Sequence, residues 1–484
     1  MNKKEEIIQF FLEKGFLVNP SFINNINENF DKETFLSKLY NLEGRPRVLD
    51  GSIFGLIDGK ISSETQNVEI IKSYQENLGK KDVQGFVNYF RSRYFVLKKI
   101  LLNRPELQEA ISISKVVNKR ERETVSLVGL ITKKEYTKNN NISIILEDVT
   151  GVIPILINKN KPELYNLAKD LVLDEVIGVK GIVGNRIVFI NEIYFPDVPT
   201  NKDLKKCNDD VYVAFISDIH MGLYAFLSED FSRFLNWLNG DTGDERQKEL
   251  AKKVKYLFIV GDLVEGVGVY PNHERDLVIK DIYEQYKRLA DYLKLIPKHI
   301  KIIVCGGNHD ALRIAEPQPI LYKDIAAPLW NLPNVTITTN PALVRIHSSK
   351  EFPGFDVLIY HGFSIPYFAN SIDSIRMSGG QNKIDSIMKF LLQRRHLAPT
   401  YMSTLYIPGN EDDPLLIDKV PDFFVTGHIH KVVATNYKNI SLICAGCWVS
   451  GTPYQERRGI IPEPSKVVLA SLKTREFKIL NFGK

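Results

Sequence analysis

The feature that most constrains the fold of this chain is a set of apolar segments in its second half that each lead into Asp, Asn or His. The segments are VYVAFISDIH, VKYLFIVGDLVEG, IKIIVCGGNHD, FDVLIYHGFS and DFFVTGHIHK. A short apolar run followed by Gly, Asn or Asp is typical of a buried strand and the loop after it. Such loops are where α/β folds gather their ligands. Residues 210–484 are therefore predicted to form an α/β domain with a polar site at its strand ends.

The polar residues at these strand ends form a candidate site. An Asp after a strand is often a helix N-cap, and a single buried His is commonly a core residue with a satisfied hydrogen bond. Here, however, five of the nine histidines follow apolar runs of this kind, which favours a shared function. The candidate residues are Asp218, His220, Asp262, Asn308, His309, His361, His428 and His430.

The spacing of these residues suggests a metal centre. If the chain is extended there, Asp218 and His220 point to one face, and so do His428 and His430, because side chains repeat every two residues along a strand. With Asp262 between them, these groups could hold two metals that share one carboxylate. Two such cations clamp a phosphate and activate a bridging water. A mixed nitrogen and oxygen ligand set suits Mn, Fe or Zn better than Ca or Mg.

The first half of the chain has a different texture. Residues 1–45 place apolar residues at helical spacing and are predicted to form a small helical domain, followed by a linker over 46–80 and a helical connector over 81–111. Residues 112–200 read as about five strands, with one helix between the third and the fourth. That is the pattern of an OB barrel. Such barrels bind nucleic acid or mediate protein contacts, and the sequence leaves both open.

Composition sets the broad class of the protein. The chain is 44% hydrophobic and 25% charged, as expected for a globular protein, and its net charge of +5 is compatible with a polyanionic partner without requiring one. Four cysteines are too few for a disulfide scaffold and fit a reducing compartment. We find no secretory leader and no apolar run of about 18 residues. A cytoplasmic protein without a membrane segment is expected.

The strand-end motifs identify a family. DIH, GDLVEG, GGNHD, HG and GHIH resemble the five motifs of the calcineurin-like metallophosphoesterases, and are nearer to the double-strand-break-repair nuclease than to the protein phosphatases. A barrel before such a domain resembles the B-subunits of replicative DNA polymerases. LLQRRHLAPTY resembles a segment typical of those B-subunits. FVNYFRSRYFVLKKILLNRPELQ resembles the helix before the barrel in the archaeal members, the small subunits of family-D DNA polymerase.

This resemblance implies a fold and a function. The fold is multidomain and combines α/β and all-β domains. It has an N-terminal helical segment, an OB-fold barrel, and a calcineurin-like domain that is a two-sheet β-sandwich flanked by helices. The function is that of a replicative polymerase small subunit that carries a two-metal 3′–5′ proofreading exonuclease and scaffolds the large catalytic subunit. The alternatives are a non-catalytic scaffold subunit and a free-standing metallophosphoesterase. Implied partners are the large subunit, a single-stranded or frayed DNA 3′ end, and as an open option the sliding clamp.

The resemblance also implies a role for each residue. Two divalent ions are expected, Mn²⁺ first, with Fe, Zn or Mg as alternatives. His309 would stay off the metals and act on the leaving oxygen as a proton donor or a cationic stabiliser. Asp262 would bridge the metals, one of which would be held by Asp218, His220 and His430, and the other by Asn308, His361 and His428.

Other residues give weaker signals. Glu265 is either a partner of a ligand or a surface carboxylate, and Asp310 is expected to orient a neighbour through a hydrogen bond. The pair Cys444 and Cys447 has the spacing of half a zinc site, but without a second pair we favour buried thiols.

Two regions outside the motifs suggest contacts. His396, with Arg394 and Arg395, is expected at the subunit interface rather than on DNA phosphate. The insertion over about 364–420 is rich in Ser, Asn, Pro and Asp and is expected to be a lid or a partner-binding loop rather than core. The surface is expected for His273, His299 and His347.

Overall fold

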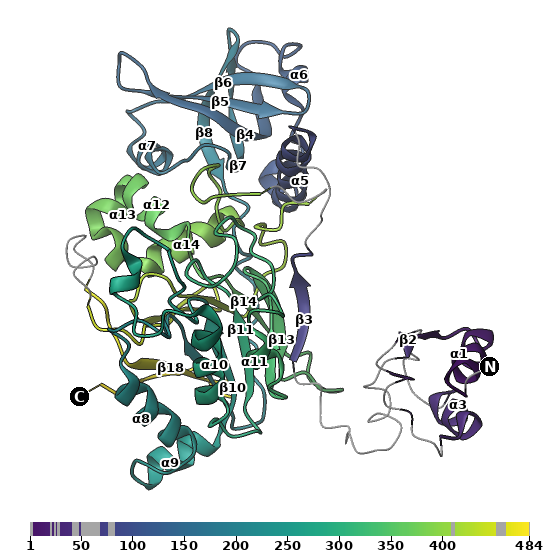
Figure 1. Ribbon diagram of the computed structural model, residues 1–484. Helices are drawn as coiled ribbons and strands as arrows, with labels where there is room; N and C mark the ends of the chain where they lie inside the picture. Colours follow the sequence, from purple (N-terminus) through teal and green to yellow (C-terminus); the bar gives the residue numbers. More distant parts are fainter. Residues whose placement is uncertain are drawn as a thin grey trace. The chain divides into compact units, whose positions relative to one another are not determined.

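The chain folds into a small helical unit, a closed β-barrel and a two-sheet sandwich flanked by helices, as predicted (Figure 1). The computed structural model describes residues 3–19, 22–23, 26, 30–40, 48–49, 68–75, 83–407, 412–451 and 461–483. Two compact units can be distinguished: residues 1–67 with 347–351 form the first, and the rest of the chain forms the second.

The first unit has an aromatic core. The ring of Phe11 lies 5.4 Å from that of Phe22 and 5.9 Å from that of Phe35, centroid to centroid, and all three side chains are buried. Aromatic side chains bury a large area each, which helps so small a unit to form a core. The described elements are α1 (Lys3–Glu13), β1 (Leu17–Val18), α3 (Lys32–Tyr40) and β2 (Val48–Leu49), with β1 and β2 paired in parallel.

The barrel has the predicted OB order, with a helix between its third and fourth strands. Inward and outward residues alternate: in the second strand Ile142, Ile144 and Leu146 are fully buried, as the two-residue period of a strand requires. The barrel closes in the order β4-β5-β6-β8-β7. Its elements are β4 (Thr124–Tyr136), β5 (Ile142–Asp148), β6 (Gly151–Ile157), α7 (Pro162–Lys169), β7 (Val176–Gly184) and β8 (Ile187–Tyr194). Before it lie α5 (Val83–Leu101), η1 (Pro105–Leu107) and α6 (Ile113–Val116).

Two six-stranded sheets form the sandwich. The first runs β12 (Val335–Ile337), β11 (Lys301–Cys305), β10 (Val254–Val260), β9 (Tyr212–Ile216), β18 (Lys466–Ser471) and β19 (Phe477–Asn481). The second runs β16 (Val433–Tyr437), β17 (Ile440–Cys444), β15 (Phe423–Thr426), β14 (Phe355–Ile359), β13 (Ala342–Ile346) and β3 (Val68–Ser73). Strands β9, β10 and β11 are parallel to one another, and so are β14 and β15.

Alternate residues of the central strands pack into different layers of the core. In β10, Tyr256 and Phe258 pack between the two sheets, whereas Leu257 and Ile259 pack against helices. Buried on both faces, such strands read as continuous apolar runs. The helices on the first sheet are α8 (Ser228–Leu238), α9 (Glu245–Lys252), α10 (Ile282–Leu293) and α11 (Ala327–Trp330), and η2 (His273–Arg275) lies in the connection before α10.

Strand β3 lies in the segment that was expected to be a linker. It pairs antiparallel with β13 at the edge of the second sheet, from Val68 opposite Ile346 to Ser73 opposite Ala342. The polar residues around this short apolar stretch concealed a strand whose partner is about 270 residues away in the sequence. Part of the predicted linker therefore belongs to the sandwich, and the other domain boundaries stay predictions.

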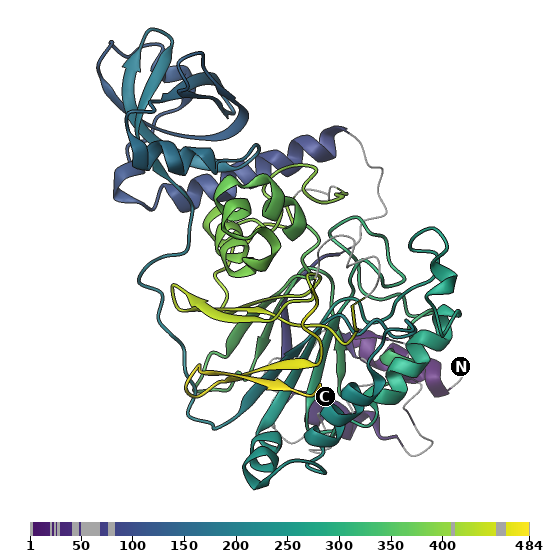
Figure 2. The same cartoon turned by 90° about the vertical axis from the view of Figure 1, so that its left-hand side faces the viewer.

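The insertion over 364–420 was wrongly expected to be a loop outside the core. Ile365, Phe368, Ile387 and Leu391 pack with strands of the second sheet in one buried cluster. In both views the helices of this insertion lie between the barrel and the strands (Figures 1 and 2). Apolar residues at helical spacing outweigh the polar residues that separate them. The elements are α12 (Ile365–Ser371), α13 (Asp373–Ser378), η3 (Gly380–Asn382) and α14 (Ile384–Arg394).

A buried ion pair joins the insertion to the barrel. Nε of Arg394, at the end of α14, lies 2.9 Å from Oε2 of Glu175, which precedes β7. The guanidinium also donates to the carbonyl of Asp170 at 3.0 Å and lies 3.5 Å from the ring centroid of Phe390. Arg395 donates to the carbonyl of Ile417 at 2.6 Å. Both arginines are buried within this chain. The expectation that they face a partner subunit or DNA is wrong.

His396 is likewise interior. Its Nε2 donates to Asp413 at 2.7 Å, and its Nδ1 accepts the amide N–H of Ala398 at 2.9 Å. Arg93 of α5 binds the same carboxylate at 3.0 Å. Burial, reinforced by the charge of Arg93, lowers the pKa of His396 to about 4. The expected interface position is wrong, because the ring is only 1% exposed and ties α5 to the segment after α14.

Among the predictions for other cysteines and histidines, some are confirmed and others are wrong. Cys444 and Cys447 are buried free thiols, as predicted. His299 is exposed, as predicted. The surface expectation is wrong for His347 and His273, which are buried.

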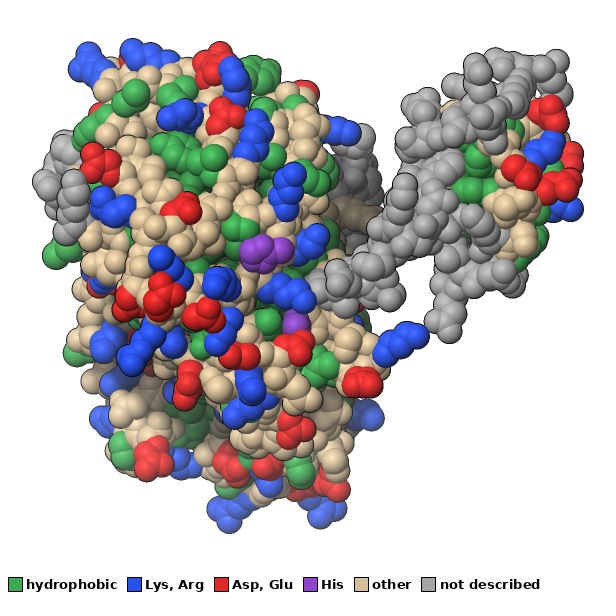
Figure 3. All heavy atoms as spheres, turned by 90° about the horizontal axis from the view of Figure 1, so that it is seen from below, with side chains coloured by type: hydrophobic (Ala, Val, Ile, Leu, Met, Phe, Trp, Pro, Cys, Tyr) green, Lys and Arg blue, Asp and Glu red, His purple; other side chains and the backbone are tan. Residues whose placement is uncertain are grey.

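One face of the molecule carries charges of both signs. In Figure 3 acidic and basic side chains are interspersed, without a broad area of one sign. The formal charge of +5 is therefore not gathered on this face. Across the described residues no helix is long and apolar enough to cross a membrane.

Removing one partner of the Arg394–Glu175 pair should destabilise the fold more than removing both. Arg394→Leu leaves a buried, unpaired carboxylate, at a cost of about 3–5 kcal/mol. Burial raises the pKa of Glu175 and lowers that of Arg394 despite their attraction, so desolvation outweighs it. Arg394→Met with Glu175→Leu should therefore recover most of the loss in urea unfolding midpoints. Glu135→Gln, in the exposed Lys133–Glu135 pair, is the control. Equal losses in the single and double variants would contradict the argument.

Acid should destabilise the protein through His396. Its folded pKa of about 4 lies below the ordinary 6.5, so between these values the unfolded chain binds more protons. The contribution is complete above pH 6.5 and is lost as the pH falls toward 4, on the order of 3 kcal/mol in all. His396→Gln cannot titrate, so its urea midpoint should fall less between pH 7 and 4.5, whereas exposed His299→Gln should follow the wild type. Parallel curves for wild type and His396→Gln would refute this assignment.

Candidate metal centre

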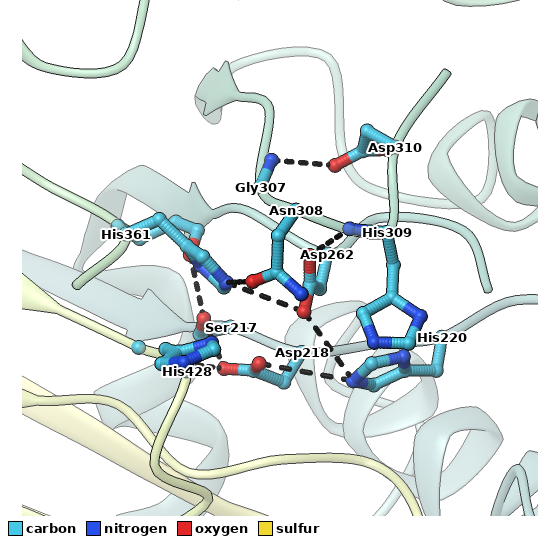
Figure 4. A network of polar contacts seen from close by, with 12 residues as sticks. Ser217, Asp218, His220, Asp262, Gly307, Asn308, His309, Asp310, His361 and His428 are labelled. Carbon is cyan, nitrogen blue, oxygen red and sulfur yellow. Dashed lines mark hydrogen bonds and ion pairs between the residues drawn. The ribbon is translucent and has the colours of Figure 1, made fainter. Parts of the chain in front are cut away.

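The ends of five strands deliver the predicted residues to one edge of the sandwich, and Figure 4 labels all of these residues except His430. Three of the strands belong to the first sheet and two to the second, so the site lies where the sheets face each other. The structure brings together all eight predicted residues: Asp218 and His220 after β9, Asp262 after β10, Asn308 and His309 after β11, His361 after β14, and His428 and His430 after β15.

One group of side chains surrounds Asp218. Its Oδ1 lies 3.3 Å from Nε2 of His430 and 3.7 Å from Nε2 of His220, and the two Nε2 atoms are 3.2 Å apart. The other oxygen, Oδ2, accepts hydrogen bonds from Ser217 Oγ at 2.5 Å and from the amide of His428 at 2.9 Å. These two donors hold the carboxylate so that Oδ1 points at the two imidazoles.

Asp262 lies between this group and a second one. Its Oδ2 is 3.8 Å from Nε2 of His220 and 3.2 Å from Nε2 of His361. Its Oδ1 accepts the amide N–H of His309 at 2.8 Å, which fixes the carboxylate plane. Nε2 of His361 is also 3.1 Å from Oδ1 of Asn308. A single carboxylate oxygen therefore faces one histidine of each group.

His428 completes the second group and differs from its neighbour in charge. Its ring centroid lies 5.1 Å from that of His361, and the two rings can share a ligand set with Asp262. Burial opposes a charge on His361, yet the Asp262 carboxylate raises its pKa to about 9. Burial and the charged His361 lower the pKa of His428 to about 3. Without ions, a proton on His361 compensates the buried carboxylate while His428 stays neutral.

The loops at this edge use left-handed backbone conformations. Positive φ values occur at Asp218 (51°), His220 (51°), Asp262 (47°), His428 (69°) and His430 (57°). The expectation that the D-x-H and H-x-H pairs are extended is therefore wrong, although their side chains do converge. Left-handed residues other than Gly cost about 1–3 kcal/mol each and persist only where the surroundings enforce them. Their concentration here indicates a functional site.

Two glycines allow the close approach of these loops. Gly261 has a φ of +81°, and a Cβ there would collide with the ring of His361. At Gly307 a Cβ would collide with the carboxylate and the amide of Asp262. The glycines of these motifs are thus required by contact between neighbouring loops.

His309 lies at the rim of the cluster. Its side chain is 19% exposed, whereas the side chain of His220 is only 5% exposed. Nδ1 of His309 is 3.0 Å from the carbonyl of Glu265, which can only accept, so Nδ1 carries a proton. Nε2 has no hydrogen bond to another residue in the part of the chain that the structure describes. His309 is close enough to His220 and Asp262 to count with them as a further potential ligand set. Its predicted place off the metals stays a prediction.

Glu265 is a buried partner of the cluster, which the sequence left open. Its Oε2 lies 2.6 Å from Nδ1 of His220, and its Oε1 lies 2.9 Å from Nε2 of His273. Burial would raise the pKa of this carboxyl, but His220 holds it well below the usual range. A Glu three residues after Asp262 was the available signal. Nothing in the sequence marked His273, because its burial depends on the fold of the loop.

Asp310 supports the turn, as predicted. Its Oδ2 accepts the amide N–H of Gly307 at 2.8 Å and that of Leu263 at 3.2 Å, and its Oδ1 accepts the hydroxyl of Tyr286 at 3.0 Å. The side chain thereby ties the turn after β11 to the loop after β10 and to α10. It positions Asn308 without belonging to the cluster.

The chemistry of the cluster fits divalent ions. Asp218 Oδ1 is buried and has no hydrogen-bond partner among the described residues, although the imidazoles of His430 and His220 lie 3.3 and 3.7 Å from it. Two Nε2 atoms 3.2 Å apart repel through their lone pairs unless a proton or a cation lies between them. Buried carboxylates with imidazoles are the donors that Mn, Fe and Zn prefer. The residues present therefore fit such ions.

Two family models match the chain. Residues 211–432 match the calcineurin-like phosphoesterase family, and residues 125–194 match an OB-fold nucleic acid binding domain. The first match spans all eight predicted residues, and the second spans the barrel.

Curated relatives match nearly the whole chain. The DNA polymerase II small subunit of Methanothermobacter thermautotrophicus is 37% identical over 88% of this chain and 83% of its own length. That of Archaeoglobus fulgidus is 36% identical over 94% of this chain and 87% of its own length. That of Pyrococcus furiosus is 36% identical over 88% of this chain and 69% of its own length. The chain therefore belongs to the family of archaeal DNA polymerase II small subunits.

Proposed function

We propose that the cluster at the strand ends is a two-metal 3′–5′ exonuclease that removes misincorporated nucleotides for the polymerase of which this chain is the small subunit. The observation that carries the proposal is the position of Asp262, whose Oδ2 faces His220 at 3.8 Å on one side and His361 at 3.2 Å on the other. A complete ligand set around such a carboxylate supports an active phosphoesterase.

Calcineurin-like phosphoesterases bind divalent metals, and we propose that the cluster supplies two ligand sets for such ions. Asp218, His220 and His430 would hold one ion, Asn308, His361 and His428 the other, and Asp262 would bridge. When bound, two such ions supply positive charge to a phosphodiester and acidify a water molecule that serves as the nucleophile. We propose Mn²⁺ as the first choice, with Fe, Zn or Mg as alternatives.

His309 would act on the leaving group. Cleavage forms a bond from the water oxygen to phosphorus and breaks the bond from phosphorus to the 3′-oxygen, which must gain a proton. Nδ1 of His309 is held by the carbonyl of Glu265 at 3.0 Å. Nε2 would therefore be the atom of His309 that donates this proton. Burial opposes a charge on His309, but Asp262 raises its pKa and favours the protonated form. The products would be a 5′-mononucleotide and a shortened strand with a 3′-hydroxyl.

We also propose that the chain scaffolds the large catalytic subunit and receives the DNA 3′ end as a single or frayed strand. The barrel match to a nucleic acid binding family supports contact with DNA near the exonuclease. A purely structural subunit would need no ligand set, so the intact cluster favours an enzyme over a non-catalytic scaffold. Contact with the sliding clamp stays an open prediction.

Metal binding should follow the division of ligands. Isothermal titration of metal-free protein with Mn²⁺ is expected to give two ions per chain. Asp262→Asn should weaken both, whereas Asp218→Asn should weaken chiefly one. The thermal midpoint should rise with added Mn²⁺, because ions that bind only the native state stabilise it. Exposed Asp291→Asn is the control. Two ions bound with unchanged affinity by Asp262→Asn would show that this carboxylate does not bridge.

His309 should be required for cleavage but not for metal binding. On single-stranded DNA labelled at its 5′ end, with Mn²⁺, the wild type should produce a ladder that shortens from the 3′ end. His309→Ala should cleave about 10²–10⁴-fold more slowly. A substrate with sulfur in place of the bridging 3′-oxygen needs no proton on its leaving group. With this substrate the cleavage rates of wild type and His309→Ala should therefore differ less.

The assay has two controls. His299→Ala removes an exposed histidine and should match the wild type. Each assay is repeated with the large subunit, since the isolated chain could be weakly active. Equal trace activity in wild type and His309→Ala under both conditions would contradict the exonuclease and favour the non-catalytic scaffold subunit.

A further inference from the structure

A buried histidine outside the metal cluster has no part in the function proposed so far. His273 is fully buried, in the short η2 turn of the loop that follows Glu265. Its neighbours in this turn, Asn272 and Glu274, are exposed. Its ring centroid lies 4.2 Å from that of Tyr270, and both of its ring nitrogens make hydrogen bonds.

The tautomer of His273 is set by the backbone. The amide N–H of Val269 donates to Nδ1 of His273 at 3.2 Å. An amide N–H can only donate, so Nδ1 carries no proton, and in the neutral ring the proton lies on Nε2. Nε2 is 2.9 Å from Oε1 of Glu265, to which it therefore donates.

This hydrogen bond determines what the other oxygen of Glu265 does. With Oε1 held by His273, Oε2 is directed to Nδ1 of His220 at 2.6 Å. The Nδ1 proton of His220 is then engaged, and its Nε2 lone pair faces Asp218 and His430. A carboxylate that accepts from the far nitrogen of a ligating histidine fixes both its tautomer and its orientation.

A competing partner explains why Oε1 must be held. Nδ1 of His309 lies 3.4 Å from Oε1 of Glu265 but 3.0 Å from the carbonyl of the same residue. If His273 did not occupy Oε1, the carboxylate could turn toward His309 and away from His220. His273 thus keeps the two histidines on different acceptors of one residue.

We propose that His273 is a positioning residue that acts through Glu265 to fix the ring of His220 as a metal ligand and the ring of His309 at the rim. This inference rests on the proposed role of the cluster as a metal centre. It assigns a function to a residue that touches neither substrate nor metal.

The loop has a second anchor, which makes the role of His273 testable. The side chain of Gln285 accepts from the amide of Gly266 at 2.9 Å and donates to the carbonyls of Gly266 at 3.0 Å and Ile279 at 2.8 Å. These three bonds do not involve His273 or Glu265. Removal of the imidazole should therefore leave the loop in place.

The test compares His273→Leu, which removes both ring nitrogens, with His273→Gln, whose amide can still donate to Glu265. Mn²⁺ affinity of the full-length protein, measured by titration and by electron paramagnetic resonance, is the first readout. His273→Leu should weaken one of the two sites about 10–100-fold and leave the other nearly unchanged. His273→Gln should restore it to within a few-fold. In the exonuclease assay, His273→Leu should lower kcat more than it changes KM.

A matched control loosens the same loop but keeps the ring that packs against His273. Tyr270→Phe removes a hydroxyl that donates to Asp276 at 2.7 Å, and it should bind Mn²⁺ like the wild type. Should His273→Leu fail to fold, Glu265→Gln replaces it, and it should weaken the same site while His273→Gln does not.

Two results would overturn the inference. One is unchanged Mn²⁺ affinity in His273→Leu, or in Glu265→Gln where it stands in. The other is an equal loss in His273→Leu, His273→Gln and Tyr270→Phe, which would show a packing role. Failure of the proposed function is a separate result: the wild type would bind Mn²⁺ but not cleave DNA, and the affinity comparison would still test His273.

Discussion

The structure is organised around two carboxylates that are buried together. Asp218 and Asp262 are at most 1% exposed, and a buried carboxylate needs a compensating charge. In the protein alone, hydrogen bonds from Ser217 and backbone amides satisfy one oxygen of each, while imidazoles face the other. A divalent ion that replaces a proton on those rings meets the same need with more charge. Contacts within the protein therefore hold the candidate ligands in place by themselves.

This arrangement carries a cost that the sandwich has to offset. Five of the candidate ligand residues adopt left-handed backbone conformations, each unfavourable by about 1–3 kcal/mol. The turns that contain them follow strands whose side chains pack on both faces, such as Tyr256 and Phe258 between the sheets and Leu257 and Ile259 under the helices. Because the strands cannot shift without opening these cores, they fix the turns at their ends. Within each sheet these strands are parallel, so their turns lie at one end of that sheet, and the turns of the two sheets meet at the cluster.

The sequence predicted which residues come together, but it did not predict their backbone conformation, and the difference has a physical reason. Apolar runs that lead into Asp, Asn or His are a local pattern, and the fold of this family places such ends together, so all eight residues could be named. The left-handed conformation of Asp218 or His430 leaves no such trace, because it is imposed by neighbouring loops. The same limit applies to His273 and His396, whose burial depends on Glu265 and Asp413. Burial that arises from long-range contacts cannot be seen in a window of sequence.

The buried position of Arg394 and of the segment after α14 bears on how the barrel is attached to the phosphoesterase domain. Arg394 joins the barrel at Glu175, and His396 and Arg93 meet on Asp413, so this region links α5 and the barrel by buried polar contacts. It also packs on the second sheet through apolar side chains. Such contacts are specific, because a displaced partner would leave a buried charge unpaired. A DNA strand held on the barrel would thus meet the metal centre in a defined register. The segment would be needed for that geometry whether or not the centre is active, so its presence alone does not separate a nuclease from a scaffold, and the ligand set has to do so.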